Sequence, residues 1–137
     1  MIKKNKNPHF VKELETGYVV IGDYQYFKGY TLFLCKIHVT ELHKLSSRFR
    51  QKFLKDMSTV AEAVFNAFRP EKLNYELLGN AEPHLHWHIF PRYKKEFYKG
   101  PVWNVDKKIR YSDEAKPSSV YLKELKKAIL DNLNKRL

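Results

Sequence analysis

Three histidines at every second position are the residues of this sequence best suited to chemistry. His84, His86 and His88 alternate with Leu85 and Trp87. Because successive side chains of a β-strand point to opposite faces, the three imidazoles would share one face and the apolar residues would face the core. An imidazole face buries poorly, since every buried ring needs a hydrogen-bond partner. The run therefore predicts a strand that carries a function.

The alternation is compatible with three kinds of face. It can be the solvent-exposed side of an amphipathic strand, although threonine or lysine would serve that purpose as well. It can be a metal site, since two alternate histidines can ligate one ion; no carboxylate lies within the run, although Glu82 is close. It can be a reactive face, since a neutral imidazole is nucleophilic at pH 7 and its cation donates to a departing oxygen. We favour the reactive face, with chemistry at a phosphorus or acyl centre.

The residues around the histidines resemble the histidine-triad (HIT) superfamily of nucleotide hydrolases and transferases. Residues 84–92 match the family's triad, in which apolar residues separate three histidines. Residues 74–83 stand where the family has the strand and phosphate loop that precede the triad. The sequence of these two segments resembles that of bacterial HIT proteins described as diadenosine polyphosphate hydrolases. The resemblance extends over about residues 14–93.

The resemblance implies a role for each histidine. His86 would attack the α-phosphorus of an adenine nucleotide and form a nucleotidyl-histidine intermediate, which water would then hydrolyse. This covalent route divides one difficult displacement into two, and imidazole is a good nucleophile and a good leaving group. His88 would hydrogen-bond the non-bridging phosphate oxygens in the transition state, and His84 would support its neighbours. A backbone carbonyl is expected to fix the tautomer of His86.

The resemblance also implies substrate contacts outside the triad. Asn74 matches a family asparagine that contacts phosphate, although it stands one residue nearer the triad than in the branch compared. Asn80 stands where the family often has glutamine, and its amide would donate to the phosphate or the bridging oxygen. Asp23 resembles the acidic residue that holds the ribose hydroxyls. Asn80 and Asp23 are also residue types that suit plain turns.

Two aromatic residues complete the expected substrate contacts. Tyr30 follows Gly29, where many family members carry a further histidine. A phenol donates a hydrogen bond but is not a cation at pH 7, so a Tyr30 that lines the site would handle the leaving group differently. Trp103 would stack on an adenine or on a partner subunit, unless it packs in the core as aromatic residues commonly do. The remaining histidines after the second strand, His38 and His43, are expected on the surface.

Hydrophobic periodicity predicts the elements that position these residues. A long helix is expected over residues 46–68, capped by Ser46 or Ser47 and stopped by Pro70. A second amphipathic helix is expected over residues 118–137. The segments expected to be strands are residues 9–14 (a short strand or a helical turn), 18–21, 30–37, 73–78 and 84–93. Residues 1–8 are expected to be flexible and residues 94–117 to form a loop.

Strands and helices segregate along the chain, which predicts the α+β class. We expect one HIT-like domain over residues 1–137, with an antiparallel sheet of about five strands, one long central helix and a C-terminal helix. The composition of 43% hydrophobic residues is sufficient for a packed core. The single cysteine, Cys35, lies in an apolar stretch and is expected to be buried; alone, it excludes an intrachain disulfide and a multi-cysteine zinc cluster.

The net charge of +11 favours an anionic partner or substrate. We expect a nucleotidyl hydrolase for substrates of the diadenosine tetraphosphate type or a related adenylylated molecule. No cofactor is expected beyond magnesium on the substrate's polyphosphate, and the resemblance implies a homodimer. Without a secretory signal or an apolar run long enough for a membrane, a cytoplasmic location and no membrane partner are expected.

Two other functions stay open at this point. A non-catalytic nucleotide- or RNA-binding module agrees with the positive charge but leaves the intact triad unexplained. Nucleic acid is not the expected partner, since no nucleic-acid-binding signature is present. A metal-dependent hydrolase that uses the histidines as ligands is the third candidate.

Overall fold

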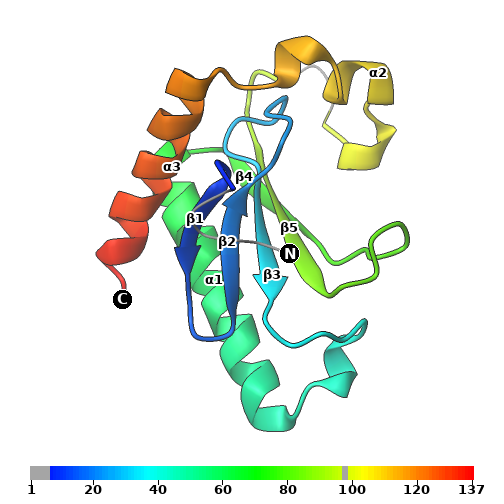
Figure 1. The fold of residues 1–137 in the computed structure, drawn as a ribbon. Helices are drawn as coiled ribbons and strands as arrows, with labels where there is room; N and C mark the ends of the chain where they lie inside the picture. Colours follow the sequence, from blue (N-terminus) through cyan, green and yellow to red (C-terminus); the bar gives the residue numbers. More distant parts are fainter. Residues whose placement is uncertain (1–6, 97–98) are drawn as a thin grey trace.

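A five-stranded antiparallel sheet forms the centre of the computed structural model, which describes residues 7–96 and 99–137 (Figure 1). The strand order is β1–β2–β3–β5–β4, so β1 and β4 are the edges. The strands are β1 (Phe10–Glu13), β2 (Gly17–Ile21), β3 (Thr31–Cys35), β4 (Lys72–Glu76) and β5 (His86–Arg92). The sheet and two main helices confirm the predicted α+β class. Of the segment expected to be flexible, residues 1–6 lie outside the described residues.

The long helix α1 (Ser47–Phe68) begins and ends where the sequence predicts. The Ser46 side chain accepts a hydrogen bond from the backbone N–H of Phe49, at 3.3 Å, which satisfies one of the unpaired donors of the first turn. Arg69 adopts a left-handed conformation with φ of 50° and is followed by Pro70, which cannot continue the helix.

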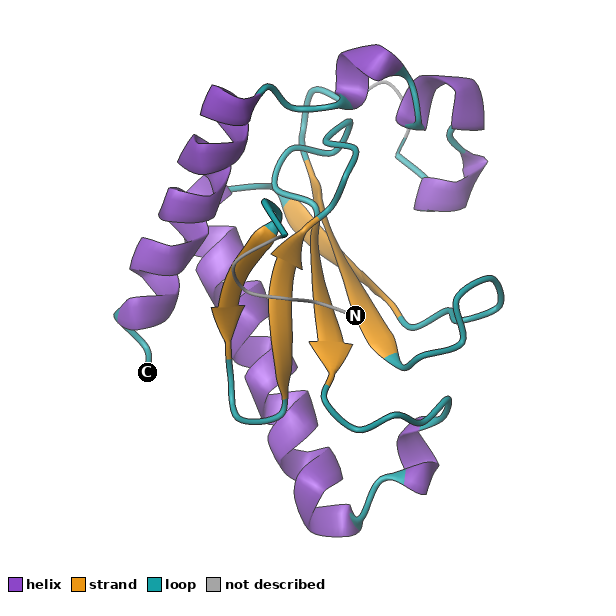
Figure 2. Ribbon diagram, in the orientation of Figure 1, coloured by secondary structure: helices purple, strands orange, loops and turns teal. Residues whose placement is uncertain are grey.

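The main core lies between the sheet and the two long helices, α1 and α3 (Ser119–Asn134) (Figure 2). The rings of Phe33 from β3 and Phe53 from α1 stack there with centroids 5.5 Å apart. Helix α3 contributes the apolar side chains of its periodic stripe, Leu122, Leu125, Ile129 and Leu133. Cys35 is buried in the same core, as expected. No helix within the described residues is both long and apolar enough to cross a membrane.

The turn between β1 and β2 is fastened to α1 by one carboxylate. Asp56 accepts hydrogen bonds from the hydroxyl and the backbone N–H of Thr16, at 2.7 and 3.2 Å. Thr16 is fully buried, so these bonds satisfy polar groups that water does not reach. The hairpin and the helix are thereby held in one relative position.

The other face of the sheet is partly covered by a segment that the sequence predicts as loop. This segment contains three single-turn helices: η2 (Val102–Asn104), α2 (Lys107–Arg110) and η3 (Asp113–Ala115). It docks through Val102 and Val105, which pack with Phe27 and Phe90 in a second apolar cluster. Single turns are too short to produce a hydrophobic period, and the loop prediction for residues 94–117 therefore missed them.

Strand pairing sets the positions of the histidines. Strand β5 lies between β3 and β4, with His86 opposite Leu34, and His88 opposite both Leu32 and Glu76. The histidine strand is therefore hydrogen-bonded to a neighbouring strand on each side. On the opposite face of β5, Ile89 is fully buried and Trp87 packs against the main core, so the predicted alternation is confirmed from His86 onward. His84 lies before β5 begins, so the prediction of a strand from residue 84 was wrong at its start.

Candidate active site

His86 is held by a backbone carbonyl. Its Nδ1 lies 2.6 Å from the carbonyl oxygen of His84, and because a carbonyl only accepts, Nδ1 carries the hydrogen and donates. This contact confirms the expected way of fixing the tautomer. The ring is only 8% exposed, and its Nε2 points to His88. In the neutral ring Nε2 is the atom with the available lone pair, which makes it the nucleophilic atom.

His88 is the immediate neighbour of that lone pair. The two Nε2 atoms of His86 and His88 are 3.0 Å apart, with the rings inclined by 65°. Burial, and secondarily the charge of His86, lowers the pKa of His88 to about 4. At neutral pH, His88 is therefore an uncharged ring that offers one donor and one acceptor.

The ring of His84 contacts other groups, from β3 and the loop after it. Its Nε2 donates to the carbonyl oxygen of Cys35, at 2.7 Å, and its Nδ1 lies 3.0 Å from Nδ1 of His38. The two rings stack with centroids 5.1 Å apart. His38 is exposed as expected. Its contact with His84 was not predictable from the sequence, because His38 comes from the loop after β3. The contacts of His84 suit the supporting role expected for it.

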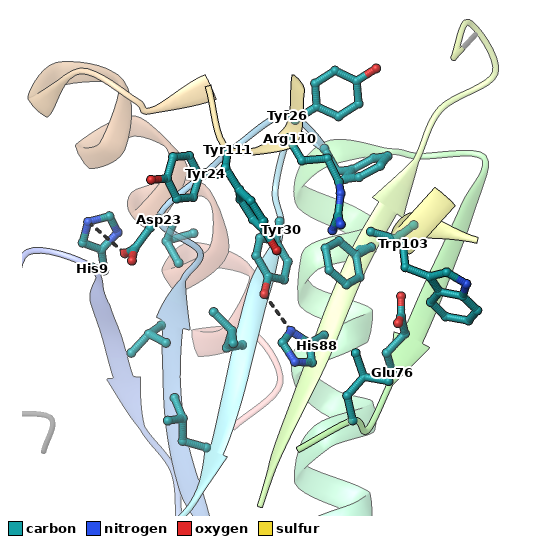
Figure 3. Close-up of a pocket in the computed structure, with 18 of the residues that line it drawn as sticks. His9, Asp23, Tyr24, Tyr26, Tyr30, Glu76, His88, Trp103, Arg110 and Tyr111 are labelled. Atoms are coloured by element: carbon teal, nitrogen blue, oxygen red, sulfur yellow. Dashed lines mark hydrogen bonds and ion pairs between the residues drawn. The ribbon is translucent and has the colours of Figure 1, made fainter. Parts of the chain in front are cut away.

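A pocket of about 590 Å³ lies beside His88 (Figure 3). Among its described lining residues, His88 is the one member of the triad. The floor of the pocket includes His88 and Tyr30, and one rim includes Asp23, two residues after the end of β2. The segment 102–116 supplies a wall that includes Trp103, Arg110 and Tyr111. Such a cavity, largely aromatic and apolar with a few polar groups, is typical of a small-molecule site.

Asp23 and Tyr30 both line the pocket, as expected from the sequence. The Asp23 carboxylate is largely exposed at the rim, where its Oδ1 lies 3.6 Å from Nε2 of His9, a histidine that sequence reasoning did not single out. The Tyr30 hydroxyl lies 2.7 Å from Nδ1 of His88, and its ring stacks on Phe90 with centroids 4.2 Å apart. Tyr30 thus touches the triad directly.

Asn74 and Asn80 are not brought to this pocket: among its described lining residues neither occurs. The side-chain oxygen of Asn74 accepts a hydrogen bond from Nη1 of Arg92, at 2.7 Å, beside a second hollow of about 440 Å³ that also contains Lys72. Asn80 is exposed in the loop after Gly79, whose φ of 92° marks a turn. Both asparagines remain expectations from the resemblance.

The pocket wall contains residues that the sequence did not reveal. The Nε of Arg110 donates to the carbonyl oxygen of Val105, at 3.0 Å, and its guanidinium lies over the ring of Tyr111, at 5.0 Å. Glu76 of β4 is the register partner of His88 on β5, and it also lines the pocket. Burial raises the pKa of its carboxyl group. Glu76 could have been found from the sequence, because it stands two residues after Asn74 on β4, and residues two apart on a strand lie on the same face. Arg110 had no such signal, because its position depends on how a distant segment docks.

Trp103 is 59% exposed and lines both hollows, so it belongs to the site rather than to the core. As for metals, no group of three or more histidine, cysteine, aspartate or glutamate side chains within residues 7–96 and 99–137 is placed to hold an ion. The site therefore offers a buried imidazole nucleophile, a neutral imidazole donor beside it, and a pocket with aromatic walls. This set of groups can perform a covalent displacement at a phosphorus or acyl centre.

The sheet and the histidine strand match a known protein family. The family model described as the HIT domain matches residues 3–95, well over half of the chain. The curated protein called "Protein hit" from Bacillus subtilis (strain 168) is 29% identical over 101 residues, which are 70% of this chain and 66% of that protein. The match therefore spans slightly less than two thirds of that relative's length.

Solved structures have the same fold. A histidine triad protein from Bradyrhizobium japonicum has a TM-score of 0.80 at 18% identity, with 97% of both chains covered. A diadenosine triphosphate hydrolase from Plasmodium falciparum has a TM-score of 0.63 at 14% identity, with 98% of this chain and 80% of that chain covered. At such identities the likeness establishes the fold.

Proposed function

This chain belongs to the HIT family, and from that premise we propose that it is a nucleotidyl hydrolase. Its substrates are dinucleoside polyphosphates of the diadenosine tetraphosphate type, or a related adenylylated molecule, cleaved at the α-phosphorus. The observation that carries the proposal is the environment of His86: Nδ1 is committed to a backbone carbonyl, which leaves the lone pair on Nε2, 3.0 Å from Nε2 of the pocket-lining His88.

The reaction has two displacements. The lone pair of His86 Nε2 attacks the α-phosphorus, the bond from phosphorus to the leaving oxygen breaks, and a nucleotidyl-imidazole forms. The positive charge that develops on the ring is stabilised by the hydrogen bond from Nδ1 to the His84 carbonyl. Water then attacks the same phosphorus, the phosphorus–nitrogen bond breaks, the mononucleotide leaves and the water proton passes to solvent.

The pocket supports a nucleotide as the occupant. Asp23 at the rim is proposed to accept hydrogen bonds from the ribose hydroxyls, and Trp103 to stack on an adenine. Arg110 places a cation in the wall, which suits the negative charge of a polyphosphate. Asn74 and Asn80 are proposed to reach phosphate oxygens. The structural neighbour that is called a diadenosine triphosphate hydrolase adds support for this substrate class.

A second copy of the chain is proposed to cover the open edge of the sheet. Strand β4 is an edge, and its Tyr75, on the helix side of the sheet, is 46% exposed. Exposed edge strands with apolar side chains are usually covered in stable proteins. A homodimer joined along β4 would bury both the edge and this ring.

The decisive experiment is product analysis after incubation with diadenosine tetraphosphate, with and without EDTA. Wild-type protein, His86→Ala and His43→Ala are compared; His43 is an exposed histidine and serves as the matched control. We expect AMP and ATP from the wild type and from His43→Ala. We expect turnover by His86→Ala to fall by about 1,000-fold or more, the scale seen when a nucleophile is removed.

The other outcomes identify the alternatives. Symmetric ADP would mean a different cleavage position and would contradict attack at the α-phosphorus. Equal turnover by His86→Ala would exclude it as the nucleophile. If all three proteins bind AMP but turn over neither diadenosine tetraphosphate nor an AMP phosphoramidate, the non-catalytic nucleotide-binding module is favoured. Loss of turnover in EDTA would show that a divalent ion assists, for which the substrate's polyphosphate is the proposed ligand.

A further inference from the structure

Tyr30 ends a row of hydrogen bonds that starts at the main chain of the histidine strand. We propose that Tyr30 is a positioning residue: its hydroxyl holds His88 in the tautomer that carries the hydrogen on Nε2, the atom that faces His86. This inference concerns the site of the proposed hydrolase and rests on that function for its kinetic consequence. Its structural content can be tested independently of turnover.

The row begins at a group that can only accept. The carbonyl oxygen of His84 lies 2.6 Å from Nδ1 of His86, so that nitrogen carries the hydrogen. In the neutral ring, Nε2 of His86 then has only a lone pair. A lone pair 3.0 Å from Nε2 of His88 requires a hydrogen on His88, because two lone pairs facing each other would repel.

The next step fixes the role of the phenol. With its hydrogen on Nε2, neutral His88 has a lone pair on Nδ1. The Tyr30 oxygen lies 2.7 Å from that nitrogen, so Tyr30 is the donor. Burial raises the pKa of the Tyr30 phenol well above its ordinary value, which keeps the hydroxyl protonated. Each of these contacts thus has one donor and one acceptor, and the order of donors runs from Tyr30 to the His84 carbonyl.

The main chain holds Tyr30 in place for this contact. Its carbonyl oxygen accepts hydrogen bonds from the backbone N–H of Gly22 and from Nε2 of Gln25, both at 2.9 Å. Its backbone N–H donates to the carbonyl oxygen of Phe27, at 3.0 Å. Gly22 also leaves room for the ring, since a Cβ there would lie 2.2 Å from Cδ2 of Tyr30. The backbone contacts and the absence of a side chain at Gly22 thus allow the ring position from which the hydroxyl meets His88.

The tautomer matters for the transition state. A substrate phosphate next to His86 brings anionic oxygens to the Nε2 of His88. The hydrogen on that nitrogen makes it a donor to those oxygens, whereas the other tautomer would present a lone pair to negative charge. In the resting site the lone pair of His86 Nε2 also favours this hydrogen, but that lone pair is withdrawn once it bonds to phosphorus. The Tyr30 hydroxyl is then the described contact that selects between the two tautomers of His88. Losing the hydroxyl should therefore reduce transition-state stabilisation more than binding.

Tyr30→Phe tests the hydroxyl alone, because it keeps the ring that stacks on Phe90. Tyr18→Phe is the control, since Tyr18 lies on β2 outside the pocket. Nitrogen-15 NMR of histidine-labelled protein reports which ring nitrogen of His88 carries the hydrogen. We expect Nε2 in the wild type and Tyr18→Phe, and a mixture with Nδ1 in Tyr30→Phe. With diadenosine tetraphosphate, kcat of Tyr30→Phe should fall about 10- to 100-fold, with KM changed less than about threefold.

Each result decides one question. If His88 carries its hydrogen on Nε2 equally in Tyr30→Phe, or if kcat is unchanged in an active protein, Tyr30 does not position His88. If Tyr30→Phe loses stability and the wild-type resonances, and Tyr30→His, which returns a hydrogen-bonding side chain, restores neither the tautomer nor kcat, Tyr30 has only a packing role. If the wild type turns over no substrate, the proposed hydrolase fails, and the NMR comparison alone then decides whether Tyr30 selects the tautomer.

Discussion

Three chemically identical side chains differ here because their neighbours differ. A carbonyl oxygen accepts the hydrogen of His86 Nδ1, and a phenol contacts Nδ1 of His88. His84 is joined to the end of β3 and to the loop that follows it. The first arrangement leaves a nucleophilic lone pair, the second leaves a neutral donor, and the third ties the strand to its surroundings. In the proposed mechanism, the backbone and one tyrosine, rather than the histidines themselves, set these differences.

The lowered pKa of His88 predicts a stability that depends on pH. The ordinary value is 6.5, and burial lowers the pKa in the folded chain to about 4. Between these values the unfolded chain binds the proton and the folded chain does not, so stability falls as the pH decreases through this window. We expect urea midpoints measured between pH 7 and pH 4 to decline, and His88→Gln to reduce the decline.

His43→Gln is the control for this measurement, because His43 is an exposed histidine outside the triad. Its pH dependence should follow that of the wild type. If His88→Gln and the wild type lose stability in parallel as the pH falls, His88 is not the group that resists protonation.

At the scale of elements, one aromatic contact joins the helix layer to the sheet. Phe53 of α1 is fully buried and stacks on Phe33 of β3. We expect Phe53→Ala to lower the free energy of unfolding by about 3–5 kcal/mol, because it removes buried area and leaves a cavity. Lys55→Ala, at an exposed position of the same helix, should change it by less than about 0.5 kcal/mol. Chemical denaturation measures both, and equal effects would mean that this contact does not hold the layers together.

The wall of the pocket gives a second prediction at this scale. Trp103 is more exposed than buried, so Trp103→Ala should leave the thermal midpoint nearly unchanged. Loss of base stacking, worth about 1–3 kcal/mol, should raise KM for diadenosine tetraphosphate about 5- to 150-fold. Trp103→Phe should restore most of the affinity, and Ile109→Ala, an exposed residue of the same segment, should have little effect. An unchanged KM in Trp103→Ala would show that the indole of Trp103 does not contact the substrate.

These elements differ in how well the sequence predicts them. The helix over residues 47–68 has several turns of apolar period, a serine cap and a proline after its end, and each signal is local. The wall over residues 102–116 consists of single turns that are stabilised by docking onto Phe27 and Phe90. Contacts of that kind depend on which distant segments meet. For the same reason the floor of the pocket was predictable from the triad, whereas Arg110 and His38 were not.

For the whole molecule, the open edge at β4 predicts the state of association. We expect light scattering after size-exclusion chromatography to give the mass of two chains for the wild type. Tyr75→Asp should give one chain, because a buried carboxylate without a partner opposes the interface. Leu137→Asp is the control. This leucine is 62% exposed and follows the end of α3, so its replacement should leave the dimer intact. A single-chain mass for the wild type would contradict the dimer.

The pocket is assembled from two stretches of the chain that have different relations to the family. The histidine floor lies within the HIT-domain match, while the wall that includes Trp103 and Arg110 lies beyond residue 95. Mutations in the wall would alter which molecule is held without moving the atoms that react. Homologous proteins descended from one gene can therefore keep the same reaction and differ in the substrates that they accept. Such differences would accumulate in a segment that contributes little to the main core.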